Sequence, residues 1–202
     1  MSVRTLTGCV LAVALLVVVG CSHGPSAVSR ASVSPSSAAA AAMEQYDADH
    51  DGKLSGAELD ACPAIKSAVD KIDPGNEGVN AEKLAARMQT WQKGVARLGV
   101  NCTVLHNGEP LAGAEVKFVP EKFLGTSYPT GEGKTAANGG AEITLPASEK
   151  DNRPGMPPGF YRIEITKGSE IPAKYNTATT LGQEIALDNK TMRAGLTYDL
   201  KY

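Results

Sequence analysis

The sequence predicts an α+β protein of two modules, in which a small helical pair is followed by an antiparallel β-sandwich of seven strands. Two observations carry this prediction. Between about residues 38 and 99 the apolar residues recur with the period of an α-helix, and from residue 100 onward they alternate in short runs separated by turn residues. With 202 residues and 42% hydrophobic side chains, the chain can bury one or two modest cores.

Residues 1–20 are expected to be a signal peptide and not part of the fold. Arg4 supplies a positive charge, and Leu11 to Val19 form an apolar run that is too short for an ordinary membrane span. The run ends just before Cys21, and this arrangement resembles the lipobox of bacterial lipoproteins. That resemblance implies cleavage before Cys21 and lipidation of its sulfur. The alternative is an ordinary secretory signal in which this cysteine is incidental.

The expected anchor also predicts a location. Ser22, and not an aspartate, follows the cysteine, and by the sorting rule of lipoproteins this favours the outer membrane. The protein is then expected to be exported and lipid-anchored in the cell envelope, facing the periplasm or the exterior. Residues 21–37 are rich in Ser, Ala, Pro and Gly, a composition that is typical of a flexible tether.

Residues 38–99 are predicted to form the helical module. An alanine-rich helix over 38–46 precedes an acidic loop, and a second helix over 57–62 ends at Pro63, which a helix interior cannot accommodate. Two further helical faces follow, with Gly99 as the expected cap of the last helix. These faces consist of Ile65, Val69 and Ile72, and then of Leu84, Met88, Trp91, Val95 and Leu98.

The acidic loop from Asp47 to Glu58 matches the EF-hand calcium-binding pattern at every ligand position. Calcium takes about six to eight oxygen ligands, so a single loop must wrap around the ion. Gly52 permits the sharp turn, and Leu54 is expected to face inward and pair with a neighbouring loop. An acidic surface loop without metal is the alternative. The predicted Ca²⁺ ligands are the side chains of Asp47, Asp49, Asp51, Ser55 and Glu58 and the backbone carbonyl of Lys53.

EF-hands normally occur in pairs, and a second loop is expected to begin at Asp73. The segment there reads DPGNEGVNAEKL, in which acidic residues and a glycine again follow the first aspartate. Val79 comes immediately after Gly78, so this loop is one residue short. Its closing position falls on Lys83 or Leu84, neither of which can bind calcium. The second loop is therefore predicted to be degenerate and to support the first loop structurally.

Two cysteines remain after residue 21. Cys62 lies in the helical module and Cys102 lies at the start of the β module. Two cysteines in an exported protein often pair, and a disulfide between them would join the two modules. Two separately buried thiols are the alternative. Structural zinc is not expected, because the chain contains no CxxC pair.

Residues 100–202 are predicted to form the β module. Val116 and Phe118 alternate with Glu115 and Lys117, as in a strand with one buried face. Asn107-Gly108 is a turn signal between two such runs. The alternation recurs over 142–145, 161–166 and 196–201, and about seven short strands of this kind indicate an antiparallel sandwich.

Three stretches of the β module are similar to a known family. NGEPLAGAEVKFVPE (107–121), PPGFYRIEI (157–165) and IPAKYNTATTL (171–181) resemble the carboxypeptidase regulatory-like, or transthyretin-like, domain of exported proteins from planctomycete-type bacteria. The resemblance implies a seven-stranded, prealbumin-like β-sandwich without catalytic residues of its own. Exported proteins of the same group often carry short EF-hand segments, which agrees with the acidic loop.

Composition excludes several classes of function. The 20 basic and 22 acidic residues show no signature of nucleic-acid binding, and aromatic residues, at 5%, are too scarce for a surface that stacks on sugars. His106 is the only histidine of the β module, and no serine lies in a nucleophile elbow. An enzyme is therefore not predicted.

Taken together, these features predict a calcium-binding envelope lipoprotein that acts as a structural or interaction module, with calcium stabilising the helical part. The expected partners are the membrane, through the lipid anchor, and an envelope protein or polysaccharide. An accessory module of a hydrolase system and a dockerin-like recognition module are the alternatives. Dockerins carry two working calcium loops, so the degenerate second loop argues against the latter. The sequence leaves the oligomeric state open.

Overall fold

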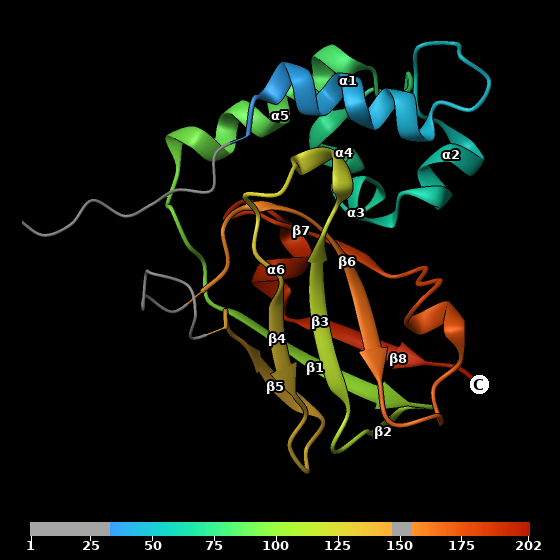
Figure 1. The fold of residues 1–202 in the computed structure, drawn as a ribbon, viewed down its shortest axis with the longest axis vertical. Helices are drawn as coiled ribbons and strands as arrows, with labels where there is room; N and C mark the ends of the chain where they lie inside the picture. The colour runs from blue at the N-terminus through green and yellow to red at the C-terminus, as the bar shows by residue number, and fades with distance from the viewer. Residues whose placement is uncertain (1–32, 147–154) are drawn as a thin grey trace, which may run out of the picture.

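The computed structural model describes residues 33–146 and 155–202. The expected signal peptide, Cys21 and most of the tether lie outside these residues. Within them, no helix is long and apolar enough to cross a membrane. The described chain is an α+β protein, because helices occupy its first part and two β-sheets follow (Figure 1).

Five helices precede the first strand and gather at one end of the two sheets (Figure 1). The first and the last of them lie side by side and carry buried apolar faces, with Ala39 and Ala42 on one and Leu84 and Met88 on the other. These faces explain the helical spacing of apolar residues in the sequence. The helices are α1 (Pro35–Tyr46), α2 (Gly56–Ala61), α3 (Pro63–Lys66), α4 (Val69–Ile72) and α5 (Ala81–Lys93).

Helix α5 is shorter than the sequence predicts. The apolar spacing continues to Leu98, but the helix ends at Lys93 and Gly94 is its C-cap, with an extended backbone at φ −94° and ψ −159°. Leu98 instead exchanges two backbone hydrogen bonds with Met156, at 2.8 and 2.7 Å. Such pairing requires an extended chain, and the low helix propensity of glycine favours the break at residue 94. Gly99 is therefore not the helix cap.

The first sheet is built around β1 (Val100–His106). On one side β1 pairs in antiparallel fashion with β5 (Gly140–Ile143) and, farther along, with β2 (Glu109–Pro110). On its other side it pairs with β8 (Leu196–Leu200), and this pair is parallel, from Cys102 opposite Leu196 to His106 opposite Leu200. The sheet is thus mixed, whereas the sequence predicts purely antiparallel strands.

The second sheet is antiparallel throughout, in the order β4-β3-β6-β7. Its strands are β4 (Gly131–Lys134), β3 (Glu115–Pro120), β6 (Gly159–Thr166) and β7 (Gly182–Ile185). The described residues therefore contain eight strands in all, where seven are expected. Two 3₁₀ turns, η1 (Lys122–Leu124) and η2 (Ala173–Tyr175), and the short helix α6 (Lys190–Ala194) connect them.

The apolar faces of the two sheets meet in the interior. Phe118 of β3 and Tyr198 of β8 have ring centroids 6.5 Å apart, and both side chains are buried. At one edge the sheets also join directly, because Glu132 and Thr144 exchange two backbone hydrogen bonds at 2.8 and 2.9 Å. Gly133 permits this approach, since a Cβ there would lie 2.5 Å from the carbonyl oxygen of Glu142.

The helices and the sheets share one hydrophobic core. Trp91 of α5 packs edge-on against Phe160 of β6, with ring centroids 4.9 Å apart. Helix α3 lies on β7, where a Cβ at Gly182 would come within 2.5 Å of the carbonyl carbon of Pro63. A glycine at position 182 is therefore what lets the helix backbone lie directly on the strand.

A buried ion pair also joins the helices to the second sheet. Arg87 of α5 donates to both carboxylate oxygens of Glu184 on β7, at 2.6 and 2.8 Å, and Glu184 is fully buried. The same guanidinium donates to Asp188 at 2.9 and 2.7 Å. Trp91 Nε1 and Asn189 Nδ2 donate to the Glu184 carboxylate at 3.2 Å each. The buried charge is thus neutralised and hydrogen-bonded from several sides.

Cys62 and Cys102 do not form a disulfide. Each is a free thiol and each is buried. Cys102 lies in β1, opposite Ala141 and Leu196. Cys62 lies between α2 and α3, and its Sγ contacts Glu121 Oε1 at 3.8 Å. The expected disulfide staple is therefore wrong, and the alternative of two separately buried thiols is confirmed. Packing and hydrogen bonds join the helices to the sheets instead.

Candidate cation site

The acidic loop connects α1 to α2, and its two ends are set by local hydrogen bonds. Asp47 is the C-cap of α1 and donates its backbone N–H to Met43 at 2.9 Å. Ser55 is the N-cap of α2, with an extended backbone. Between them, His50 and Gly52 take left-handed backbone angles, φ 59° and 81°. The glycine expected at the sharp turn therefore does make a turn that other residues rarely adopt.

Three carboxylates of this loop converge. Asp47, Asp49 and Glu58 each offer one oxygen, and these oxygens lie within 4.8 Å of one another. Asp47 is buried, Glu58 is partly buried and Asp49 is exposed. A hollow of about 340 Å³ opens beside them and is lined by Ala48, Asp49, Ser55, Gly56, Ala57 and Glu58. The cluster has the geometry to hold a metal ion.

The Glu58 carboxylate is held in place from three directions. Oε1 accepts hydrogen bonds from the backbone N–H groups of Ala48 at 2.8 Å and Asp49 at 3.4 Å, and Oε2 accepts one from Ser55 at 3.1 Å. These bonds, with the one from Ser55 the largest cause, lower the pKa of Glu58 below its ordinary value. Glu58 therefore stays ionised at neutral pH and ties the end of the loop to its beginning.

Asp47 has one carboxylate oxygen that is bonded and one that is not. Oδ2 accepts the backbone N–H of Gly52 at 3.0 Å. Oδ1 is buried and has no hydrogen-bond partner among the described residues, although only 8% of the residue is exposed. Buried polar atoms in folded proteins are almost always paired, and a buried anionic oxygen is especially costly to leave alone. An ion at this oxygen would remove that cost.

The other predicted ligands lie in the same loop but outside the group of three carboxylates. Asp49 Oδ1 accepts the N–H of Asp51 at 3.1 Å, and Asp51 Oδ1 in turn accepts the N–H of Lys53 at 2.8 Å. Ser55 lines the hollow. The structure thus brings together Asp47, Asp49 and Glu58, while the side chain of Asp51 is bonded to the loop backbone.

A second loop, between α4 and α5, lies against the first. Leu54 and Val79 form an antiparallel bridge with two backbone hydrogen bonds, at 2.8 and 3.1 Å, so the predicted pairing of Leu54 with the neighbouring loop is confirmed. In this second loop the ammonium of Lys83 contacts Asp73 Oδ1 at 2.7 Å and Glu77 Oε2 at 3.2 Å. The sequence predicts that Lys83 cannot bind calcium. It does not reveal that the ammonium group of Lys83 lies between the carboxylates of Asp73 and Glu77.

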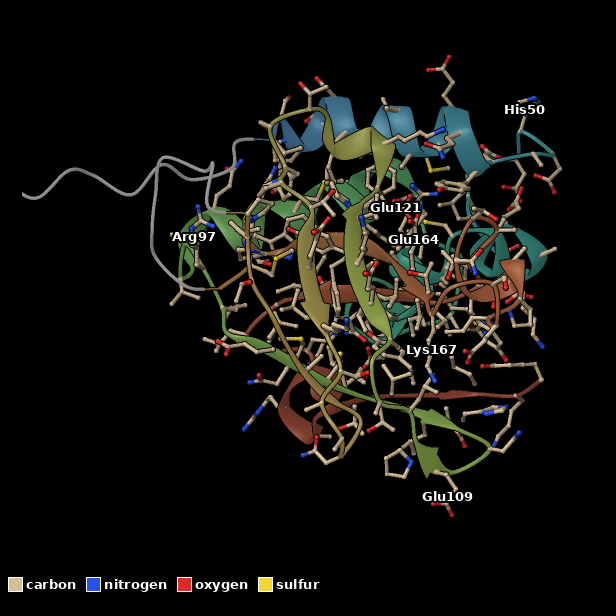
Figure 2. All side chains as sticks on the ribbon, turned by 60° about the horizontal axis from the view of Figure 1, so that its bottom comes forward. His50, Arg97, Glu109, Glu121, Glu164 and Lys167 are labelled. Carbon is tan, nitrogen blue, oxygen red and sulfur yellow. The ribbon has the colours of Figure 1, made fainter. Side chains whose placement is uncertain are left out.

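Glu121 is a buried carboxylate that the sequence does not single out. It lies just after β3 and is 1% exposed, and Figure 2 shows it between α1 and the strands. Tyr46 donates its hydroxyl to Oε2 at 2.9 Å and Cys62 Sγ is 3.8 Å from Oε1, while Arg162 is 3.9 Å from Oε2. Burial raises the pKa of Glu121 above its ordinary value. The residues that flank the acidic loop therefore meet on one carboxyl group.

Comparisons of the chain with protein-family models, with curated proteins and with solved structures give no match. The similarity of the β module to the carboxypeptidase regulatory-like domain therefore stays a prediction, as does the lipoprotein anchor. What the structure adds is an acidic loop with a geometry fit for a metal ion.

Proposed function

We propose that the protein binds one calcium ion in the loop Asp47–Glu58 and that this ion stabilises the helical part against the sheets. The observation that carries the proposal is that Asp47, whose carboxylate converges with those of Asp49 and Glu58, has a buried Oδ1 without a hydrogen-bond partner among the described residues. Three carboxylates this close repel one another, and a divalent cation between them converts that repulsion into attraction. The loop is thus electrostatically incomplete without an ion.

The donor set favours calcium over transition metals. Its side-chain donors are oxygen atoms of carboxylates and a hydroxyl, without the cysteine or histidine ligands that zinc and copper prefer. A loop that supplies ligands from alternate residues also suits the large and flexible coordination sphere of calcium better than the strict octahedron of magnesium. We expect a dissociation constant of about 10⁻⁵ to 10⁻³ M, as is typical of calcium modules outside the cytosol.

The proposal assigns the loop to the EF-hand class and gives each ligand a role. Asp47, Asp49 and Glu58 supply the carboxylates that already converge. Asp51 joins them by leaving the backbone N–H of Lys53, whose carbonyl is a further ligand, and Ser55 contributes directly or through water. The bridge between Leu54 and Val79 supports the pairing of two such loops.

Calcium titration calorimetry on the purified full-length protein tests this proposal. We expect binding of one ion, with magnesium as a much weaker competitor. Glu58→Gln removes one charge and one closing oxygen and is expected to weaken calcium binding by about tenfold or more. The matched control is Glu44→Gln, which removes the same charge from an exposed position on α1. Equal affinities in the two variants, or no heat with the wild type, would refute the assignment.

We further propose that the protein is a non-enzymatic envelope lipoprotein whose β module is a transthyretin-like sandwich and serves as a structural or interaction surface. The apolar run before Cys21 supports the anchor, and the contact between the buried faces of two sheets supports the sandwich. Metabolic labelling with palmitate tests the anchor. We expect the wild type to be labelled and Cys21→Ser to be unlabelled and released from the membrane fraction, whereas equal labelling would rule the anchor out.

A further inference from the structure

The two loops have the same backbone plan over their first six residues. In the first loop Asp47 Oδ2 accepts the N–H of Gly52 at 3.0 Å, and in the second Asp73 Oδ2 accepts the N–H of Gly78 at 2.8 Å. Left-handed residues also recur at matching places. They are His50 and Gly52 in the first loop and Asn76 and Gly78 in the second. The second loop is therefore a true structural counterpart of the first up to its glycine.

Beyond the glycine, the loops differ in length by one residue and in the sign of the charge at one position. Leu54 follows its glycine by two positions and Val79 follows its glycine by one, yet these two residues pair with each other. Beyond this pair the loops match again, because Ser55 and Asn80 are the N-caps of the exiting helices. The position three residues after the N-cap holds Glu58 in the first loop and Lys83 in the second. A closing carboxylate is thus replaced by an ammonium group.

The ammonium of Lys83 lies among the oxygens that a cation would use. Its Nζ is 2.7 Å from Asp73 Oδ1, 3.2 Å from Glu77 Oε2 and 3.3 Å from the carbonyl oxygen of Gly78. Asp73 Oδ1 corresponds to Asp47 Oδ1, the buried oxygen of the first loop that has no partner in the described part of the chain. The same carboxylate oxygen is therefore neutralised in one loop and left open in the other.

We propose that Lys83 is a tethered cation that takes the place of a metal ion in the second loop, so that this loop folds without metal and holds Val79 in position to pair with Leu54. The expectation of one calcium ion per chain rests on the proposed function. The metal-independent folding of the second loop does not.

Two further observations support this role. The hydrogen bond with Asp73 raises the pKa of Lys83 and lowers that of Asp73, so both groups stay charged across a wide pH range. The side chain of Lys53, from the first loop, packs on Gly78, where a Cβ would lie 2.9 Å from its Cδ. The backbone of the second loop thus forms part of the support for the first.

Substitution of Lys83 tests the proposal in the full-length protein with the chelator EGTA present. Lys83→Gln removes the tethered charge, and we expect the midpoint of thermal unfolding to fall by about 3 °C or more. Backbone amide exchange at Leu54 and Val79 should accelerate by about tenfold or more, because the second loop no longer holds the pair together. The matched control is Lys93→Gln, an exposed position on the same helix, which should change neither quantity. If Lys83→Gln behaves as the control does, the proposal is wrong.

Lys83→Glu tests whether the ammonium stands where an ion can bind. This variant restores a closing carboxylate beside Asp73 and Glu77, and we expect it to bind two calcium ions where the wild type binds one, with a larger rise of its unfolding midpoint on calcium addition. Uptake of two ions by the wild type, or no additional ion in Lys83→Glu, would overturn the proposal. A wild type that binds no calcium would refute the proposed function alone, because the comparison in chelator contains no metal and still decides the role of Lys83.

Discussion

The hydroxyl of Tyr46 donates a hydrogen bond of 2.9 Å to the buried carboxyl of Glu121, across 75 residues of sequence. Tyr46 is the last residue of α1 and comes directly before Asp47, the first acid of the loop. Cys62, which also contacts Glu121, comes four residues after Glu58, the last acid of the loop. Both ends of the proposed calcium loop are therefore attached to the same carboxyl group beneath the helices.

Removal of the Tyr46 hydroxyl should destabilise the whole protein. Tyr46→Phe leaves the ring in place against Phe123 but deprives Glu121 of its shortest hydrogen bond, at a cost of about 1–3 kcal/mol in the free energy of unfolding. Denaturant titration measures this change. Tyr202→Phe is the matched control, because Tyr202 is exposed, and it should stay within about 0.5 kcal/mol of the wild type. Similar losses in both variants would show that the Tyr46 bond contributes little.

Glu121 should make stability depend on pH. Burial raises its pKa, and Tyr46, Cys62, Arg162 and Lys122 offset that rise only in part. Folding therefore favours the protonated carboxyl, and this contribution is fully present below the pKa of the unfolded chain and lost as pH rises through the raised pKa. Relative to Glu121→Gln, the wild type should lose stability as pH rises from the ordinary pKa of a glutamate through the raised pKa of Glu121.

The measurement is the difference in unfolding free energy between the wild type and Glu121→Gln at a series of pH values, which cancels the titration of all other groups. Glu109→Gln is the matched control, since Glu109 is exposed on β2, far from Glu121 (Figure 2). The difference in unfolding free energy between the wild type and Glu109→Gln should not change with pH in this way. A difference that does not change with pH would mean that the carboxyl of Glu121 titrates alike in the folded and unfolded chain.

Arg87 should be among the most sensitive positions in the protein. Arg87→Met leaves the fully buried charge of Glu184 without its cation and is expected to cost about 3–5 kcal/mol. Asp188→Asn breaks only the outer contact of the same guanidinium, on a side chain that is 57% exposed, and should cost less than about 1 kcal/mol. Denaturant titration of the two variants measures these losses in the free energy of unfolding.

The double variant Arg87→Met/Glu184→Met separates the loss of the ion pair from the cost of an unpaired buried charge. We expect it to be more stable than Arg87→Met alone, because no lone carboxylate remains in the interior. A double variant that is less stable than Arg87→Met would contradict this account and would assign the loss to the bonds that Glu184 makes with Trp91 and Asn189.

Gly182 should not tolerate a side chain. In Gly182→Ala the added methyl group meets the backbone at Pro63 and Ala64, so α3 has to move away from β7, at a cost of about 1–3 kcal/mol. Gly99→Ala is the control, because a Cβ at Gly99 meets no atom within 4 Å. Thermal unfolding of the two variants gives the comparison, and an unchanged midpoint in Gly182→Ala would show that the helix can shift without loss.

Local patterns in the sequence were sufficient for the acidic loop, the short second loop and several strands. The loop pattern predicts its turn at Gly52 and the convergence of Asp47, Asp49 and Glu58, because the spacing of ligands along twelve residues is itself the geometry. Alternation predicts β3, β6 and β8, since side chains of a strand point in turn to opposite faces.

Contacts between distant segments could not be predicted in the same way. The apolar period through Leu98 does not reveal that this residue pairs with Met156, and nothing near Cys62 reveals that its neighbour is Glu121 and not Cys102. The parallel pairing of β1 with β8 likewise joins the start of the β part to the end of the chain. Such contacts depend on the path of the whole chain, whereas the patterns reflect only residues close in sequence.

The sequence by itself determined the α+β class, the twelve-residue acidic loop and the shortened second loop, because each is a property of residues close together along the chain. Only the tertiary structure decided that one buried carboxylate oxygen of Asp47 has no partner among the residues described, that the ammonium of Lys83 fills the matching place beside Asp73, and that the ends of the acidic loop meet on Glu121. Burial and electrostatic pairing arise when distant segments pack, since it is packing that removes water from a charge and supplies its counter-charge.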